Sequence, residues 1–101
     1  MSRQAQVLLV DDEVSLQRTM APLLRSRGYD VTVAGTGREA LLAIERDCPD
    51  VVVLDLGLPD LDGIEVLHGI RGWNPVPVVV LSARATSDEK VAALDAGADD
   101  Y

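Results

Sequence analysis

The chain has 101 residues, 48% of them hydrophobic, and a formal net charge of −8, which suits one domain around one core. So acidic a chain is not expected to bind nucleic acid directly, because phosphate contacts need clustered Lys and Arg. No apolar run approaches the roughly 18–20 residues of a membrane helix, and the N-terminus lacks a signal-peptide pattern. The single cysteine excludes a disulfide framework. We therefore expect a cytoplasmic protein that does not contact membranes.

Three segments of the chain look like strands of one kind. Each is continuously apolar and rich in valine, and they cover residues 7–10, 51–54 and 78–81, with a weaker run at 31–34. Continuous apolar runs, in contrast to alternating ones, are typical of parallel strands that are covered on both faces.

Helical patterns fill the gaps between these strands. Apolar residues recur at helical spacing over 16–24, 40–44, 64–70 and 91–94, and Gly28, Gly72 and Gly97 are suitable terminators. Strands that alternate with helices predict an α/β fold with a parallel sheet. Pro22 lies inside the first helical pattern and removes a backbone N–H, so we expect a kink or an irregular turn near residues 19–21.

Acidic residues stand where the strong strands end. Asp11 and Asp12 follow the first strong run, Asp55 follows the second, and Ser82 follows the third. The carboxyl ends of parallel strands share one edge of the sheet, so these side chains converge if their strands are neighbours. Two carboxylates roughly 5 Å apart repel by about 3 kcal/mol at an effective dielectric near 20, which favours a bound cation. Mg²⁺ suits an all-oxygen site, whereas the lone histidine, His68, lies elsewhere and makes zinc improbable.

Such an acidic edge has three interpretations. It could bind a divalent ion and no more. One carboxylate could instead attack phosphorus and form an aspartyl phosphate, with the metal shielding the like charges and the Ser82 hydroxyl bonding a phosphoryl oxygen. The acids could also merely begin solvent-exposed loops. The residues by themselves leave these alternatives open.

Four motifs together resemble a known family. VDDE at 10–13, LDLGLPDLDG at 54–63, LSA at 81–83 and AGADDY at 96–101 are similar to the receiver domain of two-component response regulators, in the OmpR/PhoB class. The resemblance covers essentially the whole chain. It implies a flavodoxin-like doubly wound parallel sheet with strand order 2-1-3-4, a phosphoprotein that signals and does not turn over substrate as an enzyme, a sensor histidine kinase as phosphoryl donor, and Mg²⁺.

The resemblance also implies a role for particular residues. Asp55 matches the phosphoacceptor and a metal ligand, Asp12 the direct Mg²⁺ ligand, and Asp11 the acid that holds metal-bound water. The backbone carbonyl of Gly57 matches a further metal ligand, and Ser82 matches the switch hydroxyl that moves toward the phosphate.

Two further residues and the C-terminal end complete the comparison with the family. Pro59 and Gly63 match residues that shape the loop after the phosphoacceptor. The family continues past Tyr101 with a fifth strand, a Lys-Pro pair and a fifth helix, so residues 1–101 are expected to be an incomplete receiver domain without an effector domain. In the full-length protein a C-terminal DNA-binding domain that regulates transcription is implied. An uncovered fourth strand would favour a homodimer or a strand-swapped oligomer, and Mg²⁺ binding should survive better than phosphorylation.

Two other functions compete with this interpretation. Gly35, Gly37 and Ala40 fit the G-x-G-x-x-A pattern of dinucleotide-binding proteins, and Asp55 follows at the distance of a ribose-binding acid. A phosphatase of the haloacid dehalogenase type also places a nucleophilic Asp after an apolar strand. That family needs a second Asp two residues later, where this chain has Gly57.

Overall fold

The computed structural model of the chain describes residues 4–55, 58–72 and 74–80. Strands and helices alternate along this part of the chain. The strands are β1 (Gln6–Val10), β2 (Asp30–Ala34), β3 (Val51–Leu54) and β4 (Val78–Val80), and the helices are α1 (Val14–Ser26), α2 (Gly37–Arg46) and α3 (Gly63–Arg71). Leu81 and the predicted helix at 91–94 lie outside the described residues.

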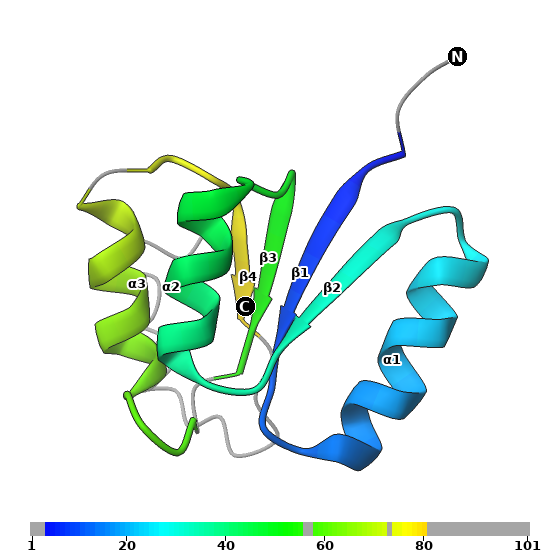
Figure 1. The fold of residues 1–101 in the computed structure, drawn as a ribbon, viewed down its shortest axis with the longest axis horizontal. Helices are drawn as coiled ribbons and strands as arrows, with labels where there is room; N and C mark the ends of the chain where they lie inside the picture. The colour runs from blue at the N-terminus through cyan, green and yellow to red at the C-terminus, as the bar shows by residue number, and fades with distance from the viewer. Residues whose placement is uncertain (1–3, 56–57, 73, 81–101) are drawn as a thin grey trace.

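The four strands form a parallel sheet in the order β2-β1-β3-β4, which confirms the predicted fold class and strand order (Figure 1). β1 is central and pairs with β2 on one side and with β3 on the other. Val10, its last residue, lies opposite both Ala34 and Leu54. The carboxyl ends of three strands therefore meet at one level of the sheet.

Helices cover both faces of this sheet, with α2 and α3 on one side and α1 on the other (Figure 1). Alternate residues of β1 join different cores: Leu8 and Val10 pack on the α2–α3 side, whereas Val7 and Leu9 pack with Ala21 of α1. All of these side chains are buried. Burial on both faces explains why β1 is continuously apolar.

Helix α1 ends as its sequence predicts. Gly28 has φ +91°, a left-handed conformation that glycine adopts without strain. Its N–H donates to the Arg25 carbonyl, and the N–H of Tyr29 donates to the Leu24 carbonyl, which satisfies two carbonyls of the last helical turn. The chain then turns directly into β2.

Of the kink or irregular turn that Pro22 predicts near residues 19–21, the irregular turn is wrong, because α1 runs through this residue without a break. Pro22 is exposed while its neighbour Ala21 is buried against the sheet. The Arg18 carbonyl, which loses its usual donor, belongs to an exposed residue where water can replace that donor. None of the described helices is long and apolar enough to cross a membrane.

Candidate functional site

Three carboxylates gather at the carboxyl ends of β1 and β3. Asp11, Asp12 and Asp55 each offer one oxygen atom, and these atoms all lie within 4.8 Å of one another. The backbone fixes two of the three acids, since the Asp55 N–H donates to the Val10 carbonyl at 2.9 Å and the Asp11 N–H donates to the Ala34 carbonyl at 3.0 Å. The predicted convergence of these acids is therefore confirmed, and it follows from the adjacency of β1 and β3.

The three acids differ in exposure. Asp11 is buried, with 4% of its surface exposed, Asp55 is half-buried, and Asp12 is exposed. Burial raises the pKa of the Asp11 carboxyl above its ordinary value of 3.8, and the charges of Asp55 and Asp12 add to this effect. The Glu13 N–H, which donates to Asp11 Oδ1 at 2.8 Å, opposes it.

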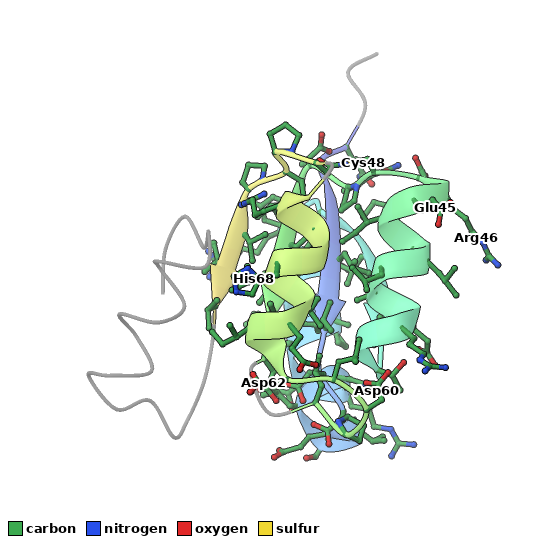
Figure 2. The ribbon with its side chains drawn as sticks, turned by 90° about the vertical axis from the view of Figure 1, so that its left-hand side faces the viewer. Glu45, Arg46, Cys48, Asp60, Asp62 and His68 are labelled. Carbon is green, nitrogen blue, oxygen red and sulfur yellow. The ribbon has the colours of Figure 1, made fainter. Side chains whose placement is uncertain are left out.

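This donor set fits a hard divalent cation. All the ligand atoms are carboxylate oxygens, which Mg²⁺ prefers to nitrogen or sulfur. A cation would also relieve the repulsion that close carboxylates impose on one another. His68 is exposed on α3, away from this edge, as expected for a residue outside the site (Figure 2).

The turn between β1 and α1 contributes a residue that sequence reasoning missed. The side-chain amide of Gln17 donates to the backbone carbonyl of Asp11 and so braces the turn that carries the first two acids. Glu13, the N-cap of α1, makes no side-chain capping bond. The available signal was a glutamine in the first turn of the helix that follows the acidic pair. The sequence alone does not indicate where the Gln17 side chain points, because that depends on the conformation of the turn.

Of the four remaining residues that the sequence predicts for the site, two lie within the described part of the chain. Pro59 is exposed in the segment before α3, and Gly63 is buried as the first residue of that helix, just after the N-cap Asp62. Gly57 and Ser82 lie outside the described residues. Their predicted roles stay predictions.

A fourth acid at the same end of the molecule was also missed. Asp60 precedes α3, yet its carboxylate binds the start of α2 (Figure 2). Its Oδ1 accepts the Gly37 N–H at 2.7 Å and the Leu61 N–H at 2.9 Å, and its Oδ2 accepts the Arg38 N–H at 3.1 Å. These bonds, with the one from Gly37 first, lower the pKa of the Asp60 carboxyl below 3.8.

The first turn of α2 is further capped by its own side chains. The Thr36 hydroxyl accepts the Glu39 N–H at 3.1 Å, and the Glu39 carboxylate accepts the Gly35 N–H at 2.9 Å. With Asp60, these groups engage the backbone donors that a dinucleotide pyrophosphate would need. The dinucleotide-binding alternative at Gly35, Gly37 and Ala40 is therefore not supported.

Gly37 has a packing reason to be glycine. A Cβ built there would lie 2.9 Å from Leu61 Cβ and 2.9 Å from Val66 Cγ2, closer than real Cβ atoms approach. Glycine thus lets the start of α2 contact the loop before α3 and α3 itself. The motif that suggested a nucleotide site serves close packing instead.

Comparison with known proteins gives one consistent result. The model of the response regulator receiver domain family matches residues 7–101. The transcriptional regulatory protein KdpE of Mycobacterium tuberculosis is 58% identical over 95 residues, and the KDP operon transcriptional regulatory protein KdpE of Escherichia coli is 50% identical over 95 residues. Each alignment covers 94% of this chain and 42% of the relative. The chain thus spans less than half the length of these relatives. The predicted resemblance to receiver domains of response regulators is confirmed, and these relatives are regulators of the potassium-transport (Kdp) operon by name.

Solved structures agree with this result. The receiver domain of the Francisella response regulator 1452 is 37% identical, with a TM-score of 0.91 over 97% of this chain and 82% of that one. The BeF3-activated N-terminal receiver domain of Klebsiella pneumoniae RstA is 32% identical, with a TM-score of 0.89 over 95% of this chain and 82% of that one. The alternative of a phosphatase of the haloacid dehalogenase type is not supported, because the family model, the relatives and the solved structures all indicate a receiver domain.

Proposed function

The chain belongs to the response regulator receiver domain family, and from this membership we propose that Asp55 accepts a phosphoryl group from a sensor histidine kinase. The observation that carries the proposal is the cluster of three carboxylates within 4.8 Å at the ends of β1 and β3. Asp11 is too buried for a phosphoryl donor to reach. Asp55 is half-buried directly after β3, where the backbone bond to Val10 holds a nucleophile in place while leaving it accessible.

The chemistry is a simple phosphoryl transfer. A carboxylate oxygen of Asp55 attacks phosphorus, the new O–P bond forms, and the P–N bond of the donor phosphohistidine breaks. The imidazole leaves with the electron pair of that bond, and the product is an aspartyl phosphate. When Mg²⁺ is bound, it supplies positive charge that reduces repulsion between Asp55 and the phosphoryl oxygens.

The residues proposed to hold the metal are Asp12 and Asp55 as direct ligands, Asp11 through water, and the backbone carbonyl of Gly57. Asp11 supports this assignment, because its buried carboxyl has a raised pKa that a nearby cation would bring down again. We further propose that the Ser82 hydroxyl responds to the phosphoryl group, and that Pro59 and Gly63 shape the loop.

The output proposed for this signal is transcription. The relatives are named as transcriptional regulatory proteins, and they are more than twice as long as this chain. Residues 1–101 would then be the receiver part of such a cytoplasmic regulator, with a DNA-binding domain as its partner on the C-terminal side. We expect the domain itself to dephosphorylate slowly at most, since signalling requires that the phosphate persist.

The test is Mg²⁺-dependent phosphorylation by acetyl phosphate, followed by mass spectrometry of the intact chain. We expect one added phosphoryl group, its loss when EDTA removes the metal, and no addition in Asp55→Asn. Asp50→Asn is the matched control, because Asp50 lies at the opposite end of the same strand. Phosphorylation that persists in Asp55→Asn would overturn the assignment of the phosphoacceptor.

A further inference from the structure

The turn from β1 to α1 carries two of the three clustered acids, Asp11 and Asp12, and ends at Glu13 (Figure 1). Asp11 is fixed where the turn begins, because its N–H donates to the Ala34 carbonyl at 3.0 Å. Its Oδ1 also accepts the Glu13 N–H at 2.8 Å. Asp12 is exposed and lies between these two held residues. The place of its carboxylate therefore depends on the peptide groups on either side of it.

Gln17 holds both of these peptide groups from the first turn of α1. Its backbone N–H donates to the Glu13 carbonyl at 3.0 Å, and its side-chain amide donates to the Asp11 carbonyl. The half-buried amide also lies beside the residue that follows β2, since a Cβ built on Gly35 would be 3.8 Å from Gln17 Nε2. One residue of the helix is thus bonded to the backbone before Asp12 and to the backbone after it.

The side-chain bond of Gln17 acts on the turn and not on the helix. A side chain that caps a helix N-terminus accepts hydrogen bonds from the free N–H groups of the first turn. The Gln17 amide instead donates, and it donates to a carbonyl that precedes the helix. That carbonyl belongs to the peptide group that joins Asp11 to Asp12. Because a peptide group is planar, a bond to its oxygen also restrains the N–H and the Cα of Asp12.

We propose that Gln17 is a positioning residue for the acidic site: its amide fixes the peptide group between Asp11 and Asp12, and the two carboxylates then keep an arrangement that favours Mg²⁺ over Ca²⁺. The inference rests on the proposed function, because it takes these acids as the ones that hold the metal. Supporting contacts of this kind typically contribute about 10–100-fold to metal affinity. Mg²⁺ requires nearly ideal octahedral geometry, whereas Ca²⁺ accepts flexible and irregular ligands. A turn without its support should therefore lose more affinity for Mg²⁺ than for Ca²⁺.

The test removes the amide donor and keeps the length of the side chain. Gln17→Met has no side-chain N–H, so the bond to the Asp11 carbonyl is lost. In titrations followed by amide NMR, we expect Mg²⁺ binding to weaken about tenfold and Ca²⁺ binding by less than about threefold. Thr19→Val is the matched control on the same helix, because it removes the bond from the Thr19 hydroxyl to the Ser15 carbonyl. Both affinities of this control should change by less than about twofold, since the lost bond lies outside the turn.

A second readout follows the hydrogen bond itself. Without metal, the NMR signals of the Asp11 carbonyl carbon and of the Asp12 amide should move in Gln17→Met, because both belong to the peptide group that Gln17 holds. They should stay in place in Thr19→Val. The rate of phosphorylation of Gln17→Met by acetyl phosphate should fall at subsaturating Mg²⁺ and recover at saturating Mg²⁺. A residue that only stabilised the fold would not change the ratio of Mg²⁺ to Ca²⁺ affinity.

The outcomes separate this inference from the proposed function. If the unchanged chain binds Mg²⁺ and Gln17→Met binds it equally well, or loses Mg²⁺ and Ca²⁺ affinity in equal proportion, the positioning role of Gln17 is wrong while the proposed function stands. If the unchanged chain neither binds Mg²⁺ nor accepts a phosphoryl group, the proposed function fails, and the inference fails with it.

A second variant covers the case in which circular dichroism shows that Gln17→Met is unfolded. Gln17→Asn keeps a polar amide, but its side chain is one methylene shorter and cannot reach the Asp11 carbonyl from the same backbone position. A lowered ratio of Mg²⁺ to Ca²⁺ affinity in Gln17→Asn supports the proposal. A ratio equal to that of the unchanged chain overturns it.

Discussion

Two groups of aspartates at the same end of the sheet have opposite environments. Asp11, Asp12 and Asp55 face one another with their oxygens within 4.8 Å, and the buried Asp11 has a raised pKa. Asp60 instead accepts three backbone N–H groups at 2.7 to 3.1 Å, and its pKa is lowered. Aspartate thus forms both an acidic cluster that suits a cation and a structural contact to a helix.

The difference lies in what supplies the compensating positive charge. Asp60 receives it from the fold, through the donors at the start of α2. The three clustered acids repel one another and gain from a cation that comes from solution. Aspartates that the fold leaves close together are therefore the ones to interpret as functional, and those that bind a helix N-terminus as structural.

The largest expected effect separates ligands from supporting residues. Asp12→Asn should weaken Mg²⁺ binding about 100-fold, because it removes the residue proposed as a direct ligand and so costs at least as much as the loss of a supporting contact. Calorimetric titration measures the affinity. Glu13→Gln is the control, since Glu13 is an exposed acid next to Asp12, and its affinity should change by less than about twofold. Equal losses in Asp12→Asn and Glu13→Gln would mean that net charge alone attracts the ion.

The next largest expected effect is a loss of stability when the close packing around Gly37, next to Asp60, is disturbed. Gly37→Ala should destabilise the chain by about 1–3 kcal/mol, because the new Cβ would press on Leu61 and Val66. Gly35→Ala should stay within about 0.5 kcal/mol, since its Cβ would meet side-chain atoms at an ordinary 3.8 to 4.0 Å. Urea unfolding measures both values. A neutral Gly37→Ala would show that the loop and α2 can move apart freely.

Removing a charge from the acidic cluster should raise the free energy of unfolding, in contrast to the loss expected for Gly37→Ala. Without metal, Asp55→Asn should raise the free energy of unfolding by about 1 kcal/mol, because it removes one of three facing charges and solvent already screens part of their repulsion. Asp62→Asn, which alters the cap of α3 outside the cluster, should give no gain. A loss of stability in Asp55→Asn would show that Asp55 is a structural residue like Asp60.

The smallest effects are in the pH dependence without metal. The folded chain holds the Asp11 proton more tightly than the unfolded chain does, because the pKa of Asp11 is raised by folding. The stability that the protonated Asp11 contributes is therefore present below pH 3.8 and falls as pH rises through the raised pKa. Asp60 has the opposite effect: the stability that its carboxylate contributes is present above pH 3.8 and is lost as pH falls through its lowered pKa. Urea unfolding at several pH values should show that Asp11→Asn reduces the first change and Asp60→Asn the second. Identical pH profiles for both variants would contradict the assigned directions.

The sheet and its acidic edge could be predicted because they depend on local patterns. Continuous apolar runs located the strands, and β3 was predicted with the bounds that the structure shows. The position of Gly28 marked the end of α1. Once the strands were parallel and adjacent, Asp11 and Asp55 had to converge, because each directly follows its strand.

Other features depend on how distant segments meet, which local patterns do not report. Asp60 reaches Gly37 across 23 positions of sequence, and nothing near either residue indicates this contact. The glycine motif suggested a ligand because its donors were assumed to be free. Pro22 lies in a continuous helix although proline disfavours helix interiors, and the packing of its neighbour Ala21 against the sheet favours the helix at this turn.

The central position of β1 has a consequence for how the chain is made. β1 needs partners on both sides, and the later one, β3, ends 44 residues after Val10. At a synthesis rate of about 5–20 residues per second, the edge of β1 that pairs with β3 stays without its partner for roughly 2–9 s after β1 itself is made. During this interval a newly made apolar strand has an unpaired side, as an edge that other chains can join. The ribosome thus produces β1 before either of its partner strands, and this edge of the nascent chain needs protection until Leu54 has emerged.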